Sequence, residues 1–326
     1  MAAEEPGAVT GLQFFIFGQP VTMSPSPEIH NTGFAKSGFP HNYSRFDTPT
    51  IEGVLQRLHE DDCGGGSVTI PHKEAILAKL DTLSDAAAAI GAVNTVTKGE
   101  GGKLHGDNTD WLGIKNQLQD RLRARVGKAS DAAAESPEGV QQLVCLICGA
   151  GGTARAAAYA LKQMEASRVL IYNRTTVRAE ALAGEFGFEV CSDFAALGSL
   201  EELHIVVNTL PGASEFVLPD PTILQRCRPV VLEAAYIPRR TAFVAQALAA
   251  GCEIIEGIEM LFEQGCAQCE IWTKLPAPRS AIAAELLRAL FTPGSNHPAF
   301  LRMEPYDQLP GALQRESGSS AMDDGK

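Results

Sequence analysis

A glycine-rich loop is the first feature of the sequence that could do chemistry. The apolar run LVCLIC ends at Cys148, and GAGGTA follows it with Gly149, Gly151 and Ala154 in the spacing GxGxxA. Between a strand and a helix, the first glycine makes a tight turn and the second lets the backbone approach a pyrophosphate. The small third residue allows the helix to pack closely on the strand. Because the amides that open a helix bind phosphate, the motif predicts a dinucleotide site.

The residues after the next predicted strand indicate which dinucleotide is bound. NAD sites usually carry an acid there, which holds the ribose 2′-hydroxyl. In this sequence RVLIY is followed by Asn173, Arg174 and Thr175, so an arginine stands where a 2′-phosphate would be held. Arg178 is close enough in sequence to make a second contact. These residues predict NADP, and they disfavour NAD.

Oxidation of an alcohol by such a cofactor requires a group that takes the hydroxyl proton as the hydride leaves. The candidate is Lys73 in SVTIPHKEAI, with Asp110 in GDNTDWLG as its partner. We expect a helix to begin at about His72, which would place Lys73 in its first turn. The helix dipole disfavours a cation there by about 0.3–1 kcal/mol. That effect is too small to neutralise the lysine by itself, although burial beside a cofactor cleft would add to it.

Polar residues near these two suit a polyhydroxylated substrate. Thr69, Asn94 and Asn108 supply hydroxyl and carboxamide groups at predicted strand ends. Ser24 and Ser26 in TMSPSP could hold a carboxylate through their hydroxyl groups. The spacing of the serines is equally typical of a helix cap followed by a turn, so the pattern alone leaves both interpretations open.

Strands and helices alternate through most of the chain, which is typical of an α/β protein with parallel sheets. The pattern also predicts a hairpin over 91–110, an exposed loop over 127–142 and a mobile tail after Pro293. We expect strands at 12–18, 43–47, 67–70, 143–148, 168–172, 204–210, 229–236 and 253–257. The expected helices cover 26–38, 50–60, 72–81, 111–125, 153–164, 177–187, 257–273 and 280–291.

Composition excludes several classes of protein. The chain has 326 residues and a net charge of −12, which argues against nucleic acids or anionic membranes as partners. It contains no apolar run long enough for a transmembrane helix, and its N-terminus lacks the features of a signal peptide, so a cytoplasmic protein is expected. The CxxC pairs Cys145/Cys148 and Cys266/Cys269 lie in a predicted strand and a predicted helix, so we interpret them as buried thiols. No histidine spacing indicates a metal site.

Taken together, these motifs resemble the shikimate dehydrogenase family. The resemblance runs from about Leu12 to Phe291, and LEAAYIP and GDNTDWLGI are most similar to the shikimate dehydrogenase domain of the fungal pentafunctional arom polypeptide. It implies two α/β domains with a cleft between them. The substrate domain would comprise 11–116 and 258–292, a Rossmann-type NADP domain 117–257, and the mobile tail 293–326. The motifs occur in the family order: SPSPEIHN, SVTIPHK, AIGAVNT, GDNTDWLGI, GAGGTARAA, NRTTVRA and MLFEQG.

The resemblance implies the NADP-dependent, reversible reduction of 3-dehydroshikimate to shikimate, with Lys73 and Asp110 as the catalytic pair. The implied substrate residues are Ser24, Ser26, Thr69, Asn94, Tyr236 and Gln264. The implied cofactor residues are Gly149, Ala150, Gly151, Gly152, Thr153, Ala154, Asn173, Arg174, Thr175, Arg178 and Gly257.

Two alternatives stay open at this stage. Many relatives carry a histidine before the first serine, whereas this chain reads VTMSPSP, with Pro25 between the serines. Quinate dehydrogenases differ from shikimate enzymes near this point, so a quinate or quinate/shikimate dehydrogenase, including one that uses NAD, is the second interpretation. The third is a catalytically silent sensor of the quinate pathway. Because Lys73, Asp110 and the glycine loop are all retained, an enzyme is favoured. The sequence does not predict an oligomeric state.

Overall fold

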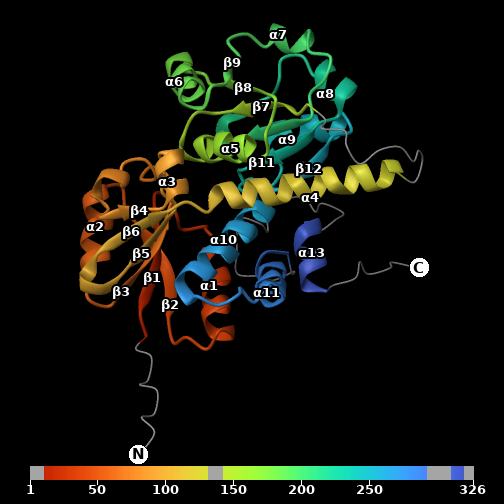
Figure 1. Cartoon of the computed structure of the whole chain (residues 1–326). Coiled ribbons are helices and arrows are strands. Elements are labelled where there is room, and N and C mark those ends of the chain that lie inside the picture. Colours follow the sequence, from red (N-terminus) through yellow and green to blue (C-terminus); the bar gives the residue numbers. More distant parts are fainter. Residues whose placement is uncertain (1–10, 131–141, 292–309, 319–326) are drawn as a thin grey trace, which may run out of the picture. The chain divides into compact units, whose positions relative to one another are not determined.

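The protein consists of two compact units, each built on a six-stranded sheet. A computed structural model describes residues 11–130, 142–291 and 310–318 (Figure 1). Among these, unit 1 comprises 11–109, 265–291 and 311–318, and unit 2 comprises 110–264 apart from the undescribed 131–141, together with residue 310. Two α/β units confirm the predicted fold class.

The sheet of unit 1 is mixed. Strand β1 (Gln13–Gly18) pairs in parallel with β2 (Asn42–Asp47) and β3 (Cys63–Val68). The other pairings include the predicted hairpin, because β5 (Thr95–Lys98) runs antiparallel to β3 and to β6 (Leu104–Asp107). The full order is β2-β1-β3-β5-β6-β4, where β4 is Thr82–Leu83.

The helices of unit 1 cover a core in which Phe17, Ile29 and Phe34 are fully or almost fully buried. Helix α1 packs on β2 and on α11, and α11 also packs against α13. Two short helices begin at side-chain caps: Thr50 accepts from the Gly53 amide, and Ser84 accepts from the Ala87 amide. The helices are α1 (Ser26–Lys36), α2 (Ile51–His59), α3 (Asp85–Ile90), α11 (Arg279–Phe291) and α13 (Gly311–Ser317), with 3₁₀ turns η1 (Leu77–Lys79) and η2 (Glu100–Gly102).

The sheet of unit 2 is parallel at every pairing that the structure describes. Its spatial order is β12-β11-β10-β7-β8-β9, so the chain builds outward from β7 in one direction and then restarts at β10 on the other side. Ligands of such sheets bind at the carboxyl ends of the strands where the order switches, here β7 and β10. The strands are β7 (Val144–Cys148), β8 (Arg168–Tyr172), β9 (Glu189–Val190), β10 (Ile205–Asn208), β11 (Val230–Glu233) and β12 (Glu253–Ile255).

Both units share one helix, α10 (Gly257–Thr273), whose first eight residues belong to unit 2 and whose remainder belongs to unit 1. The other helices of unit 2 are α4 (Asp110–Ser130), α5 (Gly152–Gln163), α6 (Thr176–Phe186), α7 (Ala195–Gly198), α8 (Thr222–Cys227), α9 (Ala242–Ala249) and the 3₁₀ turn η3 (Gly212–Ser214). The units therefore divide at 109/110 and 264/265, several residues away from the predicted 116/117 and 257/258.

The predicted helix over 72–81 is wrong, and with it the first-turn position of Lys73. Residues 71–76 form turns, and only Leu77–Lys79 is helical, as the 3₁₀ turn η1. Ile76 is fully buried in a cluster that also contains Val93 and Val96, and the chain must then return to the sheet as β4. Tertiary packing thus overrides local helix propensity, and the argument from the helix dipole does not apply to Lys73.

Other expectations also differ from the structure. The strand predicted over 67–70 is the glycine-rich β3, which ends at Val68. Helix α4 continues to Ser130, into the predicted exposed loop, while 131–141 lie outside the described residues. Helix α13 lies inside the segment predicted to be a mobile tail. It buries Ala312 and Leu313, and Glu316 forms an ion pair with Arg279 of α11 at 3.0 Å.

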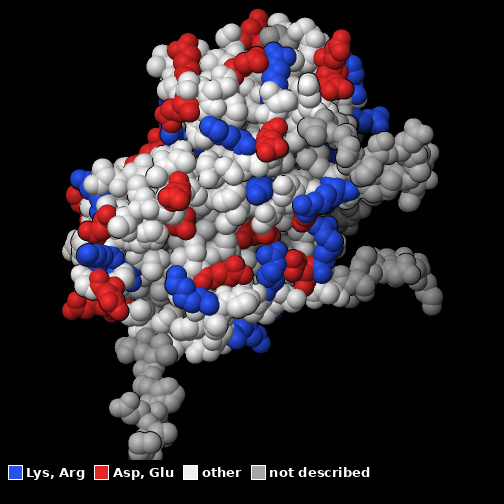
Figure 2. All heavy atoms as spheres, viewed as in Figure 1, with Lys and Arg blue, Asp and Glu red and all other residues white. Residues whose placement is uncertain are grey.

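The cysteines confirm the interpretation as buried thiols. None of the eight is part of a disulfide, and seven are buried. Burial raises the pKa of Cys145 to about 12 and that of Cys269 to about 11. Within the described ranges no helix is long and apolar enough to cross a membrane, and no cluster of His, Cys, Asp and Glu could hold a metal ion. Basic and acidic side chains are interspersed on the face seen in Figure 2.

Candidate active site

In unit 1, the strand pairing brings four predicted site segments to one edge of the sheet. Strands β1, β3 and β6 end at this edge, and β5 begins there because it runs antiparallel to β3 and β6. The Thr69 amide donates to the Phe17 carbonyl at 2.8 Å, and the Val68 amide donates to the Asn94 carbonyl at 2.8 Å. The structure therefore places the starts of the loops that follow β1, β3 and β6, which carry Ser24, Thr69 and Asn108, at the same end of the sheet as Asn94.

The predicted serines lie at the start of α1 and face each other. The Ser24 hydroxyl donates to the Ser26 hydroxyl at 3.0 Å, and the Ser26 amide donates to Ser24 Oγ at 3.3 Å. Both side chains are buried. The N-cap position of α1 is Pro25, which makes no side-chain cap bond. Ser24 thus closes a local turn, and the two hydroxyls form a buried pair that could donate to a carboxylate.

The amide of Asn94 is held in one orientation by its neighbours. Its Oδ1 accepts from the Thr109 amide at 2.8 Å and from the Thr95 hydroxyl at 2.7 Å, and its Nδ2 donates to Thr109 Oγ1 at 3.0 Å. Asn108 is fixed similarly, because its Nδ2 donates to the Ala92 carbonyl at 2.8 Å. Both side chains are almost fully buried. Thr109 is therefore a positioning residue, although sequence reasoning did not select it from the GDNTD motif.

Gln268 of α10 connects the Asn94 segment to the rest of unit 1 and was also missed. Its Nε2 donates to the Asn94 carbonyl at 3.1 Å and to Thr95 Oγ1 at 2.9 Å, and its Oε1 accepts from the Ser67 hydroxyl at 2.8 Å. The Tyr43 hydroxyl in turn donates to Ser67 Oγ at 2.7 Å. The available signal was its position one helical turn after Gln264, on the same helix face.

His30 completes this network from α1. Its Nε2 lies 3.1 Å from Gln268 Oε1, so Nε2 carries the proton in the neutral ring. His30 is fully buried, and its Nδ1 has no hydrogen-bond partner among the described residues. Burial lowers the pKa of His30 to about 3, against a weaker opposing effect of the bond to Gln268. His30 is therefore a neutral structural donor near the site and not a general acid or base at physiological pH.

The predicted catalytic residues fall in different units. Lys73 is half-buried in unit 1, in the turns after β3, where its carbonyl accepts from the Val93 amide at 2.8 Å. Asp110 is the first residue of α4 in unit 2, and it is 4% exposed. A carboxylate is favoured at a helix N-terminus by the helix dipole. The pairing of Lys73 with Asp110 stays a prediction.

In unit 2, the glycine loop has the local geometry that a dinucleotide requires. Gly149 follows β7 with φ +117°, and a Cβ there would lie 2.2 Å from Oγ1 of Thr209, which follows β10. Glycine is therefore needed here, where the residues that follow the neighbouring strands β7 and β10 come close together. A Cβ on Gly151 would project into open space, at the N-cap of α5, where a phosphate could approach the backbone. Ala154 is fully buried, as close packing of α5 requires. These residues fit a bound dinucleotide.

The residues predicted to choose the dinucleotide lie together after β8. Asn173 Nδ2 donates to the Thr175 carbonyl at 2.9 Å, and the Arg178 amide donates to the same carbonyl at 3.0 Å. Arg174 and Arg178 are exposed, and Arg174 has no carboxylate partner among the residues that the structure describes. Their exposed guanidinium groups could donate hydrogen bonds to a 2′-phosphate beside the start of α6.

The remaining predicted residues lie at the end of β11 and on α10. Glu233 ends β11 and accepts from Asn208 Nδ2 at 2.7 Å and Thr241 Oγ1 at 2.9 Å. Its burial raises its pKa. These bonds fix the start of the loop that carries the half-buried Tyr236. A Cβ on Gly257 would lie 2.7 Å from the carbonyls of residues 234 and 235, so α10 begins in close contact with this loop. Gln264 is buried, and its Nε2 donates to the Leu261 carbonyl at 3.0 Å.

Comparison with known families gives three matches along the chain. Residues 16–96 match the shikimate dehydrogenase substrate binding domain, residues 131–225 match a family described as shikimate / quinate 5-dehydrogenase, and residues 257–287 match the shikimate 5'-dehydrogenase C-terminal domain.

Individual proteins show the same similarity. The chain is 38% identical over 280 residues to the pentafunctional AROM polypeptide of Yarrowia lipolytica, in a match that covers 82% of this chain but only 17% of that polypeptide. The shikimate 5-dehydrogenase of Thermus thermophilus, solved with NADP(H) and shikimate, is 33% identical, with a TM-score of 0.69 over 86% of this chain and 100% of that one. A quinate dehydrogenase from Corynebacterium glutamicum, solved with NAD, is 25% identical, with a TM-score of 0.70 over 85% and 99% of the two chains.

Proposed function

The chain belongs to the shikimate dehydrogenase family, and on this premise we propose that it is an NADP-dependent shikimate dehydrogenase, which reversibly reduces 3-dehydroshikimate to shikimate. The observation that carries the proposal is that each unit groups residues that could form one half of such a site. Unit 1 supports it with the serine pair and the oriented Asn94, and unit 2 supports it with the Gly149 loop, whose positive φ suits glycine, and with Arg174 and Arg178 after the next strand.

The dinucleotide would be held entirely by unit 2 and would supply the hydride. The amides of Gly152, Thr153 and Ala154 lie in the first turn of α5, where helix amides lack intrahelical acceptors and can donate to phosphate. The Arg174 and Arg178 guanidinium groups would donate to the 2′-phosphate, while Asn173 and Thr175 shape the turn that presents them. Gly257 would allow α10 to approach the same site.

Specific residues would recognise the two ends of the substrate. Ser24 and Ser26 would donate their hydroxyl protons to the carboxylate, because a buried hydroxyl pair offers two directed donors. Around the ring hydroxyls, the carboxamides and hydroxyls of four further residues would exchange hydrogen bonds: Thr69, Asn94, Tyr236 and Gln264.

Proton transfer would fall to Lys73 and Asp110. During reduction, the Lys73 ammonium donates a proton to the carbonyl oxygen as the hydride reaches the ring carbon. In the reverse direction, neutral Lys73 accepts that proton from the hydroxyl. Asp110 would orient the lysine and stabilise its ammonium form between turnovers, because a nearby carboxylate favours the charged amine.

A matrix of two substrates and two cofactors tests the proposal. Initial rates with shikimate and quinate, each with NADP+ and NAD+, should be highest for shikimate with NADP+. In the variant Arg174→Ala, the KM for NADP+ should rise about tenfold or more, because a charge-assisted phosphate contact is lost, while NAD+ kinetics stay the same.

Other outcomes of the matrix identify the alternatives. A preference for quinate with NAD+ would replace the proposal by a quinate dehydrogenase, an activity also named in the description of the family matched by residues 131–225. Ligand binding without turnover in all four combinations would indicate a silent sensor. An equal loss with both cofactors in Arg174→Ala would mean that Arg174 supports structure and does not select NADP.

A further inference from the structure

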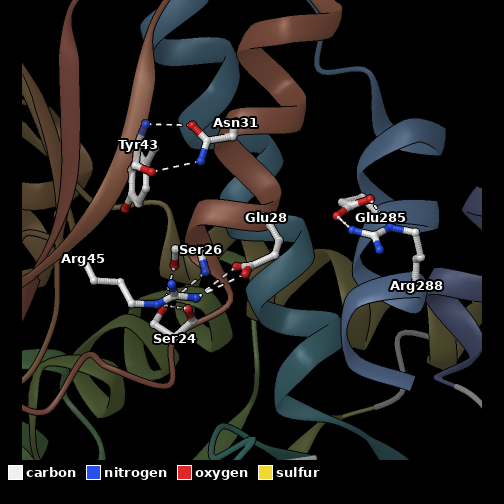
Figure 3. Close-up of polar contacts among 8 residues, drawn as sticks. All are labelled: Ser24, Ser26, Glu28, Asn31, Tyr43, Arg45, Glu285 and Arg288. Carbon is white, nitrogen blue, oxygen red and sulfur yellow. Dashed lines mark hydrogen bonds and ion pairs between the residues drawn. The ribbon is translucent and has the colours of Figure 1, made fainter. Parts of the chain in front are cut away.

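Arg45 of β2 lies beside the serine pair, although it was not among the candidate site residues. Its Nε donates to the main-chain carbonyl of Ser24 at 2.8 Å. Its Nη2 lies 3.2 Å from both carboxylate oxygens of Glu28, in the first turn of α1. Figure 3 shows the guanidinium between the turn that carries Ser24 and Ser26 and the Glu28 carboxylate. One side chain therefore ties together the turn before α1 and the first turn of the helix.

A second link joins the same strand to the same helix. The Asn31 side chain of α1 donates to the Tyr43 carbonyl at 2.9 Å and accepts from the Tyr43 amide at 2.7 Å. Tyr43 and Arg45 are two residues apart on β2, so their side chains lie on the same face of the sheet. The Asn31 link fixes the middle of α1, and the Arg45 link fixes its start. Of these two links, the one through Arg45 reaches the serines.

Each of the two arginines in this region, Arg45 and Arg288, forms an ion pair with a glutamate. Glu28 is its direct partner, and the side chains of Arg45 and Glu28 are 30% and 21% exposed. On α11, Arg288 pairs with Glu285 at 2.5 Å (Figure 3). The pKa of Arg288 is raised mainly by Glu285 and to a lesser degree by Glu28. Arg45 of β2 is thus paired with Glu28 of α1, and Arg288 is paired with Glu285 on the same helix, α11. Because the direct partner of Arg288 is Glu285 on its own helix, Arg288 is a suitable control.

We propose that Arg45 is a positioning residue that holds Ser24 and Ser26 in the geometry that receives the substrate's carboxylate. By fixing the Ser24 carbonyl, its guanidinium fixes the backbone from which the Ser24 hydroxyl donates to Ser26. The contact with Glu28 orients the guanidinium, because a planar guanidinium that is hydrogen-bonded to a carboxylate has little remaining rotational freedom. The inference rests on the proposed function, because it takes shikimate or its 3-dehydro form as the ligand of the serines.

Steady-state kinetics of three variants test this role. Arg45→Met keeps the length of the side chain and removes its donors. We expect the KM for shikimate to rise about tenfold, with kcat changed less than about threefold and the KM for NADP+ unchanged, because the residue acts at the carboxylate end only. Arg45→Lys keeps the charge but cannot make both contacts at once, so we expect an intermediate KM. Arg288→Met should match the wild type.

The neutral carboxamide analogue of shikimate supplies a readout that a general loss of structure would not produce. Relative to wild type, Arg45→Met should lose more kcat/KM with shikimate than with the carboxamide, because the charged ligand depends more strongly on two well-placed donors. Arg45→Lys serves as the second variant if Arg45→Met does not fold, with an expected KM increase of about threefold.

Different results would contradict the role of Arg45 and the proposed shikimate dehydrogenase activity. An unchanged KM for shikimate in both Arg45 variants, or an equal loss with shikimate and its carboxamide, would overturn the role of Arg45 while leaving the proposed function standing. A wild-type protein that binds shikimate without turnover would overturn the proposed function, and the role of Arg45 would then be decided by the shikimate Kd of the same variants. A wild type that does not bind shikimate would overturn both.

Discussion

At the residue scale, Lys73 carries the greatest chemical demand of the proposed reaction. It is half-buried in the turns after β3, with its main chain held by Val93. We expect Lys73→Ala to lower kcat by about 10²–10⁴, the usual contribution of a general acid–base residue, with a smaller effect on the KM for shikimate. Lys79→Ala, which changes an exposed lysine of η1, is the control and should retain wild-type kcat. Near-normal turnover in Lys73→Ala would remove this residue from the mechanism.

His30 gives the molecule a pH dependence of stability. Its pKa falls from 6.5 to about 3 on folding because of burial, so the unfolded chain binds a proton below pH 6.5 that the folded chain does not. This contribution to stability is therefore fully present above pH 6.5 and is lost as the pH falls toward 3. Between about pH 7.5 and about pH 5.5 this loss is about 1.4 kcal/mol.

Urea unfolding at these two pH values measures the effect. His30→Gln should reduce the difference in unfolding free energy between them by about 1.4 kcal/mol, since glutamine does not titrate. The exposed His59→Gln is the matched control and should show the wild-type difference. If His30→Gln shows the same pH dependence as wild type, His30 is not the residue responsible.

At the residue level, some of the site could be predicted and some could not. Gly149 was predictable because its spacing encodes a turn that only glycine makes, and its φ of +117° agrees. Arg45, Thr109 and Gln268 were not, because their roles depend on partners 21, 15 and up to 201 positions away in sequence. No local pattern distinguishes Arg45 and Thr109 from ordinary polar residues, and the local signal for Gln268 is limited to its position one helical turn after Gln264.

At the scale of elements, α10 is attached to the sheet of unit 1 through Gln268. Replacing Gln268 by leucine leaves two buried donors, the Ser67 hydroxyl and His30 Nε2, without the oxygen that accepts from them. At about 1–3 kcal/mol for each such group, we expect Gln268→Leu to lower the unfolding free energy by about 3 kcal/mol or more.

A double-mutant cycle checks that this cost comes from the network. Ser67→Ala combined with Gln268→Leu should cost less than the sum of the two single changes, by about 0.5–3 kcal/mol, because the first change has already removed a shared bond. The exposed Gln225→Leu of α8 should stay within about 0.5 kcal/mol of wild type. Strict additivity would contradict a coupled network.

Element prediction succeeded where periodicity and length agreed, as for α10, which begins and ends at the predicted residues. It failed over 72–81, where the burial of Ile76 and the return to β4 decide the backbone. It also missed α13. The polar, proline-rich surroundings of this short helix indicate a mobile tail, and its stability comes from packing on α11 with Leu313 buried, a contact that the local sequence does not reveal.

At the scale of the whole molecule, alternation of strands and helices correctly indicated two α/β units. The parallel order of unit 2 follows from repeated crossovers through helices. The antiparallel pairing of β5 with β6 in unit 1 follows from the short GEGG turn, which was predicted. The exact division was not predictable, because α10 is one uninterrupted helix whose two halves belong to different units.

This division makes a prediction about how each ligand protects the chain. NADP+ alone should slow hydrogen exchange at residues 149–155 and 173–178 of unit 2, because the amides of the α5 N-terminus would become hydrogen-bonded to phosphate. Shikimate alone should slow exchange most strongly at residues 24–28 and 92–95 of unit 1, around the serine pair and Asn94. Exchange monitored by mass spectrometry with each ligand separately measures both effects.

Gly149→Ala separates the two responses within one molecule. The added methyl group would meet Thr209 Oγ1 at 2.2 Å on a backbone with φ +117°, so the loop must distort where phosphate would bind. We expect this variant to lose the protection by NADP+ and to retain the protection by shikimate at 24–28, because the serine pair belongs to the other unit. Loss of both responses in a folded variant would show that the units do not bind their ligands independently. Protection of 24–28 by NADP+ alone would contradict the assignment of the cofactor to unit 2.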